Sequence, residues 1–140
     1  MKSRLVFVYG TLKRGHGNHC VLGASKFVCD AVTTAKYILV DCGFPYLIVP
    51  EELPEAYKKP ETARVGGEVY EVTDEAVMAS LDRLEGVSYG HYRHLNTEVW
   101  DENDTTEDPT KLVVAYAGCD PVSLLRLTPC PIVNECYKWG

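Results

Sequence analysis

The chain has 140 residues, of which 46% are hydrophobic and 24% are charged, and its net charge at pH 7 is -6. This composition is typical of a globular protein and excludes a disordered or fibrous one. The length predicts a single domain over residues 1–140, because domains cluster near roughly 100–150 residues, and such a domain needs no disulfide or metal to fold.

The first ten residues, MKSRLVFVYG, contain five consecutive apolar residues that end at Gly10. Such a run is typical of a central strand, here expected over residues 4–9. The run is too short for a signal peptide or for a membrane span, which needs about 20 apolar residues. The chain is therefore expected to be soluble and cytoplasmic, without a membrane partner.

The glycine-rich stretch GTLKRGHGN follows, and Asn18 is the predicted N-cap of a short helical segment near residues 19–24. Five further strands are predicted along the rest of the chain. Their expected bounds are residues 33–42, 45–50, 64–72, 92–100 and 111–117. The double glycine inside the third of these indicates a bulge or a close backbone approach.

The stretch TDEAVMASLDRLEG, residues 73–86, predicts the one clear helix. Thr73 is its expected N-cap, acidic residues occupy its first turn, and Gly86 is its expected end. Six strands and one helix without βαβ alternation favour an α+β domain, with a mixed sheet or small barrel on which the helix packs. The tail from Gly118 carries three prolines and shows no periodic signal.

Six acidic residues and no Lys or Arg lie between Glu98 and Thr110, so the rest of the chain is nearly neutral. This segment is expected to be a solvated, mobile connection. It repels phosphate backbones, and no basic stripe occurs elsewhere, which excludes a nucleic-acid partner. The six cysteines include no Cys-x-x-Cys pair, so reduced and mostly structural thiols are expected.

Glu85 breaks the pattern of the predicted helix. On a wheel of about 100° per residue it falls in the apolar arc, between Leu81 and Met78, whereas Asp82 falls on the polar side. Desolvation raises the pKa of an unpaired carboxyl, and a Glu near neutrality can both accept and donate a proton. The alternative is that Glu85, in the last helical turn, faces solvent or pairs with Arg93.

Four stretches carry a shared signature: VFVYGTLKRGHGN at residues 6–18, GFPYLIV at 43–49, GEVYEV at 67–72 and LDRLEGVSYGHYRH at 81–94. Together they resemble the γ-glutamyl cyclotransferase-like superfamily. The opening Tyr-Gly-Thr-Leu-Lys-Arg-Gly is most similar to the γ-glutamylamine cyclotransferases. The resemblance runs from about residue 4 to 117, and the tail after Gly118 matches no family pattern.

The resemblance implies a mixed β-barrel with packed helices and a cavity at one end. It implies Glu85 as catalytic acid/base and a substrate-binding loop. The residues of that loop are Tyr9, Gly10, Thr11 and Leu12. The family reaction converts γ-glutamylamines, such as γ-glutamyl-ε-lysine, to 5-oxoproline and free amine, and no metal or cofactor is implied. The expected partner is a small γ-glutamyl substrate, and the expected assembly is a monomer or weak homodimer.

Tyr92 and Tyr116 are further candidates for the substrate-binding site, because matching family strands carry tyrosines near these points. As strand aromatics they also suit core packing. The family often shows Tyr-x-Arg-Arg where this chain has Tyr92-Arg93-His94.

The same residues are also compatible with other functions. A γ-glutamyl amino-acid cyclotransferase is the nearest, and a non-catalytic small-molecule binding module on this fold is another. The pairs His16-x-x-His19 and His91-x-x-His94 suggest a metal site only weakly, since no carboxylate or Cys-x-x-Cys partner accompanies them. Redox sensing has little support, because no cysteine has a sequence neighbourhood that clearly lowers its pKa.

Overall fold

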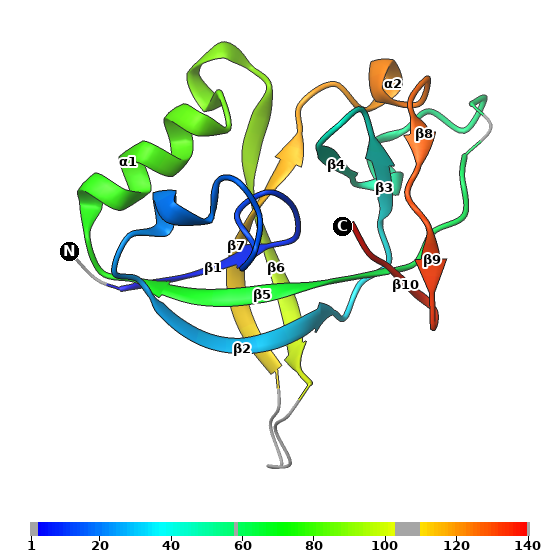
Figure 1. Cartoon of the computed structure of the whole chain (residues 1–140). Helices are drawn as coiled ribbons and strands as arrows, with labels where there is room; N and C mark the ends of the chain where they lie inside the picture. The colour runs from blue at the N-terminus through cyan, green and yellow to red at the C-terminus, as the bar shows by residue number, and fades with distance from the viewer. Residues whose placement is uncertain (1–2, 58, 103–109, 140) are drawn as a thin grey trace.

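The computed structural model describes residues 3–57, 59–102 and 110–139, and a closed barrel forms its centre (Figure 1). The barrel strands are β1 (Arg4–Val8), β2 (Lys26–Thr33), β5 (Arg64–Val72), β6 (Tyr92–Asp101) and β7 (Thr110–Gly118). They pair in the order β1-β7-β6-β2-β5, and β1 also pairs with β5, which closes the ring. β1 is parallel to β7 and the other pairs are antiparallel. The predicted α+β architecture with a mixed barrel is confirmed.

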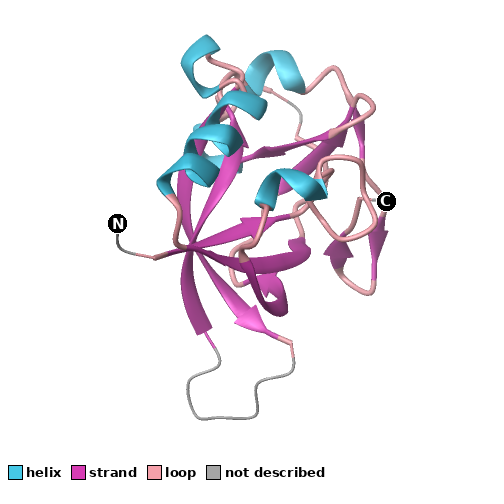
Figure 2. Cartoon of the chain, turned by 60° about the vertical axis from the view of Figure 1, so that its left-hand side comes forward, coloured by secondary structure: helices cyan, strands magenta, loops and turns pink. Residues whose placement is uncertain are grey.

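A second sheet and two helices complete the described part. The sheet contains β3 (Ile38–Asp41), β4 (Pro45–Ile48) and β8 (Thr128–Pro129), and the main sheet is extended by β9 (Ile132–Val133) and β10 (Cys136–Tyr137). The helices are α1 (Glu75–Leu84) and α2 (Pro121–Leu124), with 3₁₀ turns at His19–Leu22, Pro50–Glu52 and Val87–Tyr89. α1 and α2 lie toward the barrel end where β7 ends and β6 begins (Figure 2). No helix in the described ranges is long and apolar enough to cross a membrane.

β1 is apolar along most of its length because both of its faces are covered. Phe7 belongs to the core that includes the barrel interior, whereas Val6 and Val8 belong to a second core with Met78 and Leu81 of α1. All five side chains are buried. A strand covered on both faces shows a continuous apolar run instead of alternation. The packing of α1 on this strand places the C-terminal end of the helix beside the turn that follows β1.

The predicted strand 33–42 is wrong in its bounds. β2 ends at Thr33, and β3 begins at Ile38 after a turn, so the predicted range spans the end of one strand and the start of the next. The Thr33 hydroxyl accepts a hydrogen bond from the backbone N–H of Val65 at 2.9 Å, which secures the end of β2 against β5. The sequence does not predict β2, because Lys26 and Asp30 interrupt its apolar positions.

Asp74, and not the predicted Thr73, is the N-cap of α1. The Asp74 carboxylate accepts from the backbone N–H of Ala76 at 2.8 Å, which satisfies a donor that the helix leaves free. The helix ends at Leu84, and Gly86 follows with φ +62°, a conformation that favours glycine. The predicted end of the helix is therefore confirmed.

The tail after Gly118, for which the sequence shows no periodic pattern, forms α2 and the short strands β8, β9 and β10. Of the acidic connection that is predicted to be mobile, residues 103–109 lie outside the described residues.

The double glycine in β5 marks a close approach of two strands. A Cβ on Gly67 would lie 2.4 Å from the backbone oxygen of Val8 and 2.8 Å from Phe7 Cζ. A Cβ on Gly66 would instead meet its nearest atom, in Lys138, at 3.6 Å, which is ordinary contact. The bulge lies in β2, where the register against β5 shifts between Phe27 and Cys29.

Gly67→Ala is therefore expected to lower the free energy of unfolding by about 1–3 kcal/mol, because the new Cβ forces β1 away from β5. Gly66→Ala in the same strand is the matched control, and it is expected to stay within about 0.5 kcal/mol of the wild type. Chemical denaturation measures both. Equal stability of the two variants would show that β1 accommodates the extra carbon.

Candidate active site

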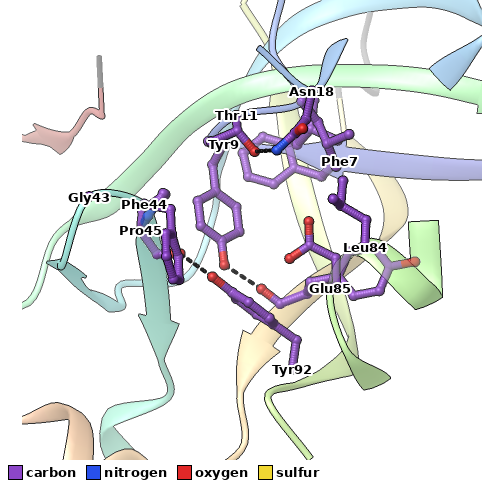
Figure 3. A pocket seen from close by; sticks show the side chains of 14 residues that line it. Phe7, Tyr9, Thr11, Asn18, Gly43, Phe44, Pro45, Leu84, Glu85 and Tyr92 are labelled. Carbon is purple, nitrogen blue, oxygen red and sulfur yellow. Dashed lines mark hydrogen bonds between the residues drawn. The ribbon is translucent and has the colours of Figure 1, made fainter. Parts of the chain in front are cut away.

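A cavity of about 290 Å³ opens where β1 ends, between the turn that follows β1, the start of β4 and the C-terminal end of α1 (Figure 3). Its lining residues are Phe7, Val8, Tyr9, Gly10, Thr11, Leu12, Asn18, Gly43, Phe44, Pro45, Leu84, Glu85, Tyr92 and Tyr116. All seven site residues predicted from the sequence are in this set. Glu85 is the one carboxylate among the lining residues, and no Lys or Arg is among them.

The turn after β1 presents unpaired donors. The backbone N–H groups of Gly10, Thr11 and Leu12 donate no hydrogen bond within the described part of the chain. Gly10 lies directly against Pro45, and a Cβ there would come within 2.7 Å of the Pro45 side chain. Adjacent free N–H groups are suited to a carboxylate or an oxyanion. Glycine at position 10 thus lets the turn pack closely on the start of β4.

Asn18 supports the same turn. It occupies the N-cap position of the 3₁₀ turn His19–Leu22, as predicted, but its side chain does not cap that turn. Instead its amide donates to the Thr11 hydroxyl at 2.8 Å, and its backbone N–H donates to the Thr11 carbonyl at 3.0 Å. Asn18 therefore links the two ends of the glycine-rich loop.

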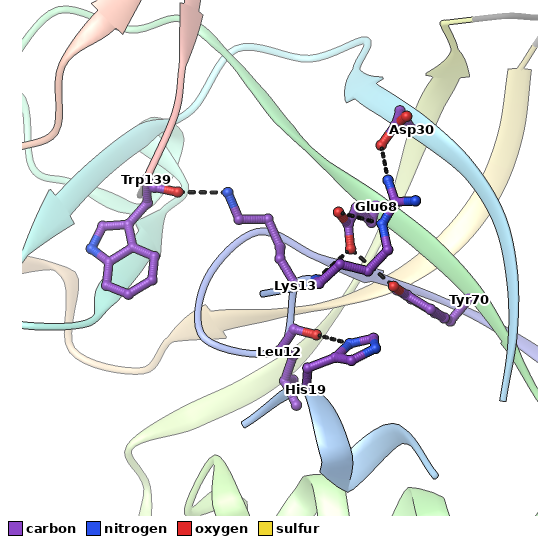
Figure 4. Close-up of polar contacts among 8 residues, drawn as sticks. Leu12, Lys13, His19, Asp30, Glu68, Tyr70 and Trp139 are labelled. Atoms are coloured by element: carbon purple, nitrogen blue, oxygen red, sulfur yellow. Dashed lines mark hydrogen bonds and ion pairs between the residues drawn. The ribbon is translucent and has the colours of Figure 1, made fainter. Parts of the chain in front are cut away.

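The loop beyond the turn is tied to β5 and to the tail (Figure 4). Glu68 accepts from the Arg14 backbone N–H at 2.9 Å, from Arg14 Nε at 3.2 Å and from the Tyr70 hydroxyl at 3.0 Å. Burial raises the pKa of Glu68, but these hydrogen bonds outweigh burial and hold it below its ordinary value. The Lys13 ammonium donates to the Trp139 carbonyl at 2.5 Å. The loop therefore has a fixed position relative to the barrel.

Glu85 is the residue that follows the last turn of α1, and its carboxylate points into the cavity (Figure 3). Within the described residues its side chain makes no hydrogen bond or ion pair. Burial raises its pKa to about 7. Arg93, the alternative partner, pairs with Glu52 at 2.5 Å. In the described part of the chain, Glu85 therefore combines a pKa near neutrality with the absence of a hydrogen-bond or ion-pair partner.

The three tyrosines of the cavity use their hydroxyls to hold the protein together. The Tyr9 hydroxyl donates to the Tyr116 carbonyl, that of Tyr92 to the Pro45 carbonyl at 2.7 Å, and that of Tyr116 to Asp82 at 2.6 Å. Burial raises the pKa of all three hydroxyls. Their rings thus form walls of the cavity, while their hydroxyls fix neighbouring segments.

The histidines and cysteines lie elsewhere. His16 is on the glycine-rich loop, His19 begins the 3₁₀ turn His19–Leu22, His91 is exposed, and His94 pairs with Asp82. No group of three or more His, Cys, Asp or Glu is arranged to hold a metal ion in the described ranges.

All six cysteines are free thiols. Burial raises the pKa of the Cys29 and Cys130 thiols to about 11, which makes them poor nucleophiles.

Phe44 and Leu84 are cavity residues that the sequence does not identify. Both are large apolar side chains that remain exposed, by 43% and 41%, and Figure 3 places them on opposite sides of the cavity. The signal for Phe44 is present in the sequence, because it lies in the family-like stretch GFPYLIV. Leu84 shows no such signal beyond being next to Glu85.

Known proteins share this sequence pattern. The family described as gamma-glutamyl cyclotransferase, AIG2-like, matches residues 6–122. A putative gamma-glutamylcyclotransferase of Arabidopsis thaliana is 39% identical over 89 residues, or 63% of this chain and 46% of that protein. Gamma-glutamylaminecyclotransferase B of Danio rerio is 35% identical over 126 residues, or 84% of this chain and 61% of that protein. The chain spans 46–68% of the length of the curated relatives it matches.

The fold is shared as well. The crystal structure of an AIG2-like protein from Mus musculus matches with a TM-score of 0.71 and 28% identity, over 92% of this chain and 86% of the mouse chain. The family match includes both the turn at Gly10 and the helix end at Glu85, the two features that form the cavity. Sequence, fold and cavity agree, and the chain belongs to the gamma-glutamyl cyclotransferase, AIG2-like family.

Proposed function

We propose that the protein is a cyclotransferase that converts γ-glutamylamines to 5-oxoproline and free amine, with Glu85 as general acid/base. The observation that carries this proposal is the Glu85 carboxyl, which has no partner in the described chain and a pKa raised to about 7, in a cavity that is also lined by Gly10, Thr11 and Leu12, whose N–H groups donate no bond there. A carboxyl that titrates near the working pH serves best as both base and acid.

The reaction needs few groups, because the substrate carries its own nucleophile. Ionised Glu85 removes a proton from the α-ammonium as its nitrogen attacks the γ-carbonyl carbon, which forms a five-membered ring and a tetrahedral oxyanion. Protonated Glu85 then donates that proton to the departing amine nitrogen as the original C–N bond breaks. The ring nitrogen gives up its second proton to water, which leaves the neutral N–H of 5-oxoproline, and the released amine takes up a proton from water to become an ammonium. Holding the substrate in a ring-closing conformation contributes roughly 7–11 kcal/mol.

The turn supplies the electrostatic part of this mechanism. The N–H groups of Gly10, Thr11 and Leu12 are donors for the α-carboxylate of the substrate or for the oxyanion. Fixed donors of this kind cost no reorganisation when the negative charge forms. The hydrogen bonds from Asn18 to Thr11 and from the Arg14 backbone N–H to Glu68 keep the donors in place.

The cavity rim favours an amine over an α-amino acid as the leaving group. Phe44 and Leu84 offer apolar surface at the rim, and no cationic side chain lines the cavity. An α-amino acid would place its carboxylate one carbon from the scissile nitrogen, where burial without a partner is costly. A lysine joined through its ε-amine places methylene groups there instead.

The test is 5-oxoproline release from γ-glutamyl-ε-lysine, γ-glutamyl-alanine and glutathione. The ε-lysine conjugate is expected to have the highest kcat/KM, by about tenfold or more. A preference for γ-glutamyl-alanine would identify a γ-glutamyl amino-acid cyclotransferase. If the folded protein binds these compounds in calorimetry but converts none of them, it is a binding module and the proposal is wrong.

A further inference from the structure

Three polar side chains from three elements meet behind one wall of the cavity. Asp82 of α1 accepts at the same oxygen, Oδ1, from His94 Nε2 at 2.7 Å and from the Tyr116 hydroxyl at 2.6 Å. His94 of β6 and Tyr116 of β7 are direct cross-strand partners, and their ring centroids are 5.3 Å apart. Asp82 therefore joins the helix to two adjacent barrel strands at one point.

This contact has no equivalent elsewhere on the helix. Among the described residues, the other side-chain hydrogen bonds of α1 are local, and the buried Met78 and Leu81 hold the helix through apolar packing alone. Apolar contacts are not directional, whereas two short hydrogen bonds to one oxygen fix both position and rotation. Asp82 is thus the contact that sets how the last turn of α1 is oriented.

Tyr116 connects Asp82 to the cavity. Its ring lines the cavity, its hydroxyl binds Asp82, and its carbonyl accepts from the Tyr9 hydroxyl at the end of β1. A continuous set of contacts therefore links the helix end to the strand that carries the substrate-binding turn. Glu85 lies three residues after Asp82 and has no partner of its own in the described chain.

We propose that Asp82 is a positioning residue, which through Tyr116 and His94 holds the last turn of α1 so that Glu85 stays inside the cavity. The expected loss of turnover rests on the proposed function, whereas the positioning of Glu85 by Asp82 does not depend on it. When the contact is lost, the helix end loosens and the Glu85 carboxylate reaches water. A displacement of about 1 Å is enough to reduce turnover strongly.

The experiment follows the Glu85 side chain by NMR. Protein with ¹³C-labelled glutamate is titrated with pH, and the Glu85 carboxyl signal is assigned by its absence in Glu85→Gln. In Asp82→Ala and in Tyr116→Phe the midpoint is expected to fall by about one pH unit, because solvation of the carboxylate favours its ionised form. Tyr116→Phe changes no charge, so it separates positioning from the loss of a negative charge at Asp82.

Turnover is measured on the same proteins with γ-glutamyl-ε-lysine. Both variants are expected to lose about tenfold in kcat with KM within about twofold, because the binding turn is untouched. The double variant Asp82→Ala/Tyr116→Phe is expected to be no worse than Asp82→Ala alone, because both substitutions remove the hydrogen bond between Asp82 and Tyr116. Glu75→Gln, which removes an exposed carboxylate from the other end of α1, is the control and should match the wild type.

Unchanged midpoints in both folded variants would overturn the proposal, and so would a change in Asp82→Ala alone, which indicates a charge effect. A wild-type midpoint near 4.5, the ordinary value for glutamate, would also overturn it, because Glu85 would then already be solvated. Absence of 5-oxoproline release from the wild type would refute the proposed function only. The NMR midpoints would still decide whether Asp82 positions Glu85.

Discussion

Glu85→Gln is expected to lower kcat for 5-oxoproline release from γ-glutamyl-ε-lysine by about 10²–10⁴-fold, the usual contribution of general acid–base catalysis. The amide has nearly the same size and shape as the acid, so the cavity keeps its form. It cannot accept a proton from the attacking ammonium or donate one to the leaving amine. Substrate affinity, measured by calorimetry, is expected to be retained, because binding is assigned to the turn at Gly10.

Glu75→Gln is the matched control for this loss. It makes the same chemical change at an exposed position in the first turn of α1, outside the cavity, and should leave kcat unchanged. Turnover by Glu85→Gln at more than about a tenth of the wild-type rate would contradict the assigned role, because a proton acceptor other than Glu85 must then act. Loss of both turnover and binding would indicate damage to the cavity instead.

The second large effect concerns stability and pH. The pKa of Glu85 is raised by burial to about 7 in the folded protein, against an ordinary value of 4.5. Between these values the folded state binds more protons than the unfolded state, so stability falls as pH rises. At roughly 1.4 kcal/mol for each pKa unit, ionised Glu85 lowers the free energy of unfolding by about 3 kcal/mol above pH 7.

Glu85→Gln removes this pH dependence. The free energy of unfolding of the variant, relative to that of the wild type, is expected to increase by about 3 kcal/mol between about pH 4 and pH 8. Urea denaturation at several pH values measures this difference. A constant difference across the range would mean that the carboxylate is solvated in the folded state. An enzyme that loses activity and gains stability through one substitution has its functional residue in a strained environment.

The position of Glu85 was predictable because helical periodicity is a local property. Leu81 and Met78 define the apolar arc, and Glu85 interrupts it, so the wheel alone indicates an unusual carboxylate. The same wheel places Asp82 on the polar side and shows nothing of its partners. Its bonds to His94 and Tyr116 depend on strands that follow later in the chain. Periodicity within one helix carries no information about them.

The strand pattern has the same limit. β1 was predictable, because a strand covered on both faces is continuously apolar. β2 was not predictable, because the charged Asp30 lies within its apolar stretch, and a charged residue there favours a loop when only the sequence is considered. In the structure Asp30 makes an ion pair with Arg14. Likewise Phe44 lines the cavity beside Pro45, which lies against Gly10, and this contact joins segments that are distant in sequence.

Closure of the barrel links the cavity to the order of folding. The ring includes the pairing of β1 with β7 at Val6 and Val114, which are 108 residues apart in the chain. Pairings between such distant segments form slowly, because the entropy of closing the loop must be overcome first. The residues that line the cavity come from both halves of the chain, from Phe7 to Tyr116, so neither half alone contains the complete cavity.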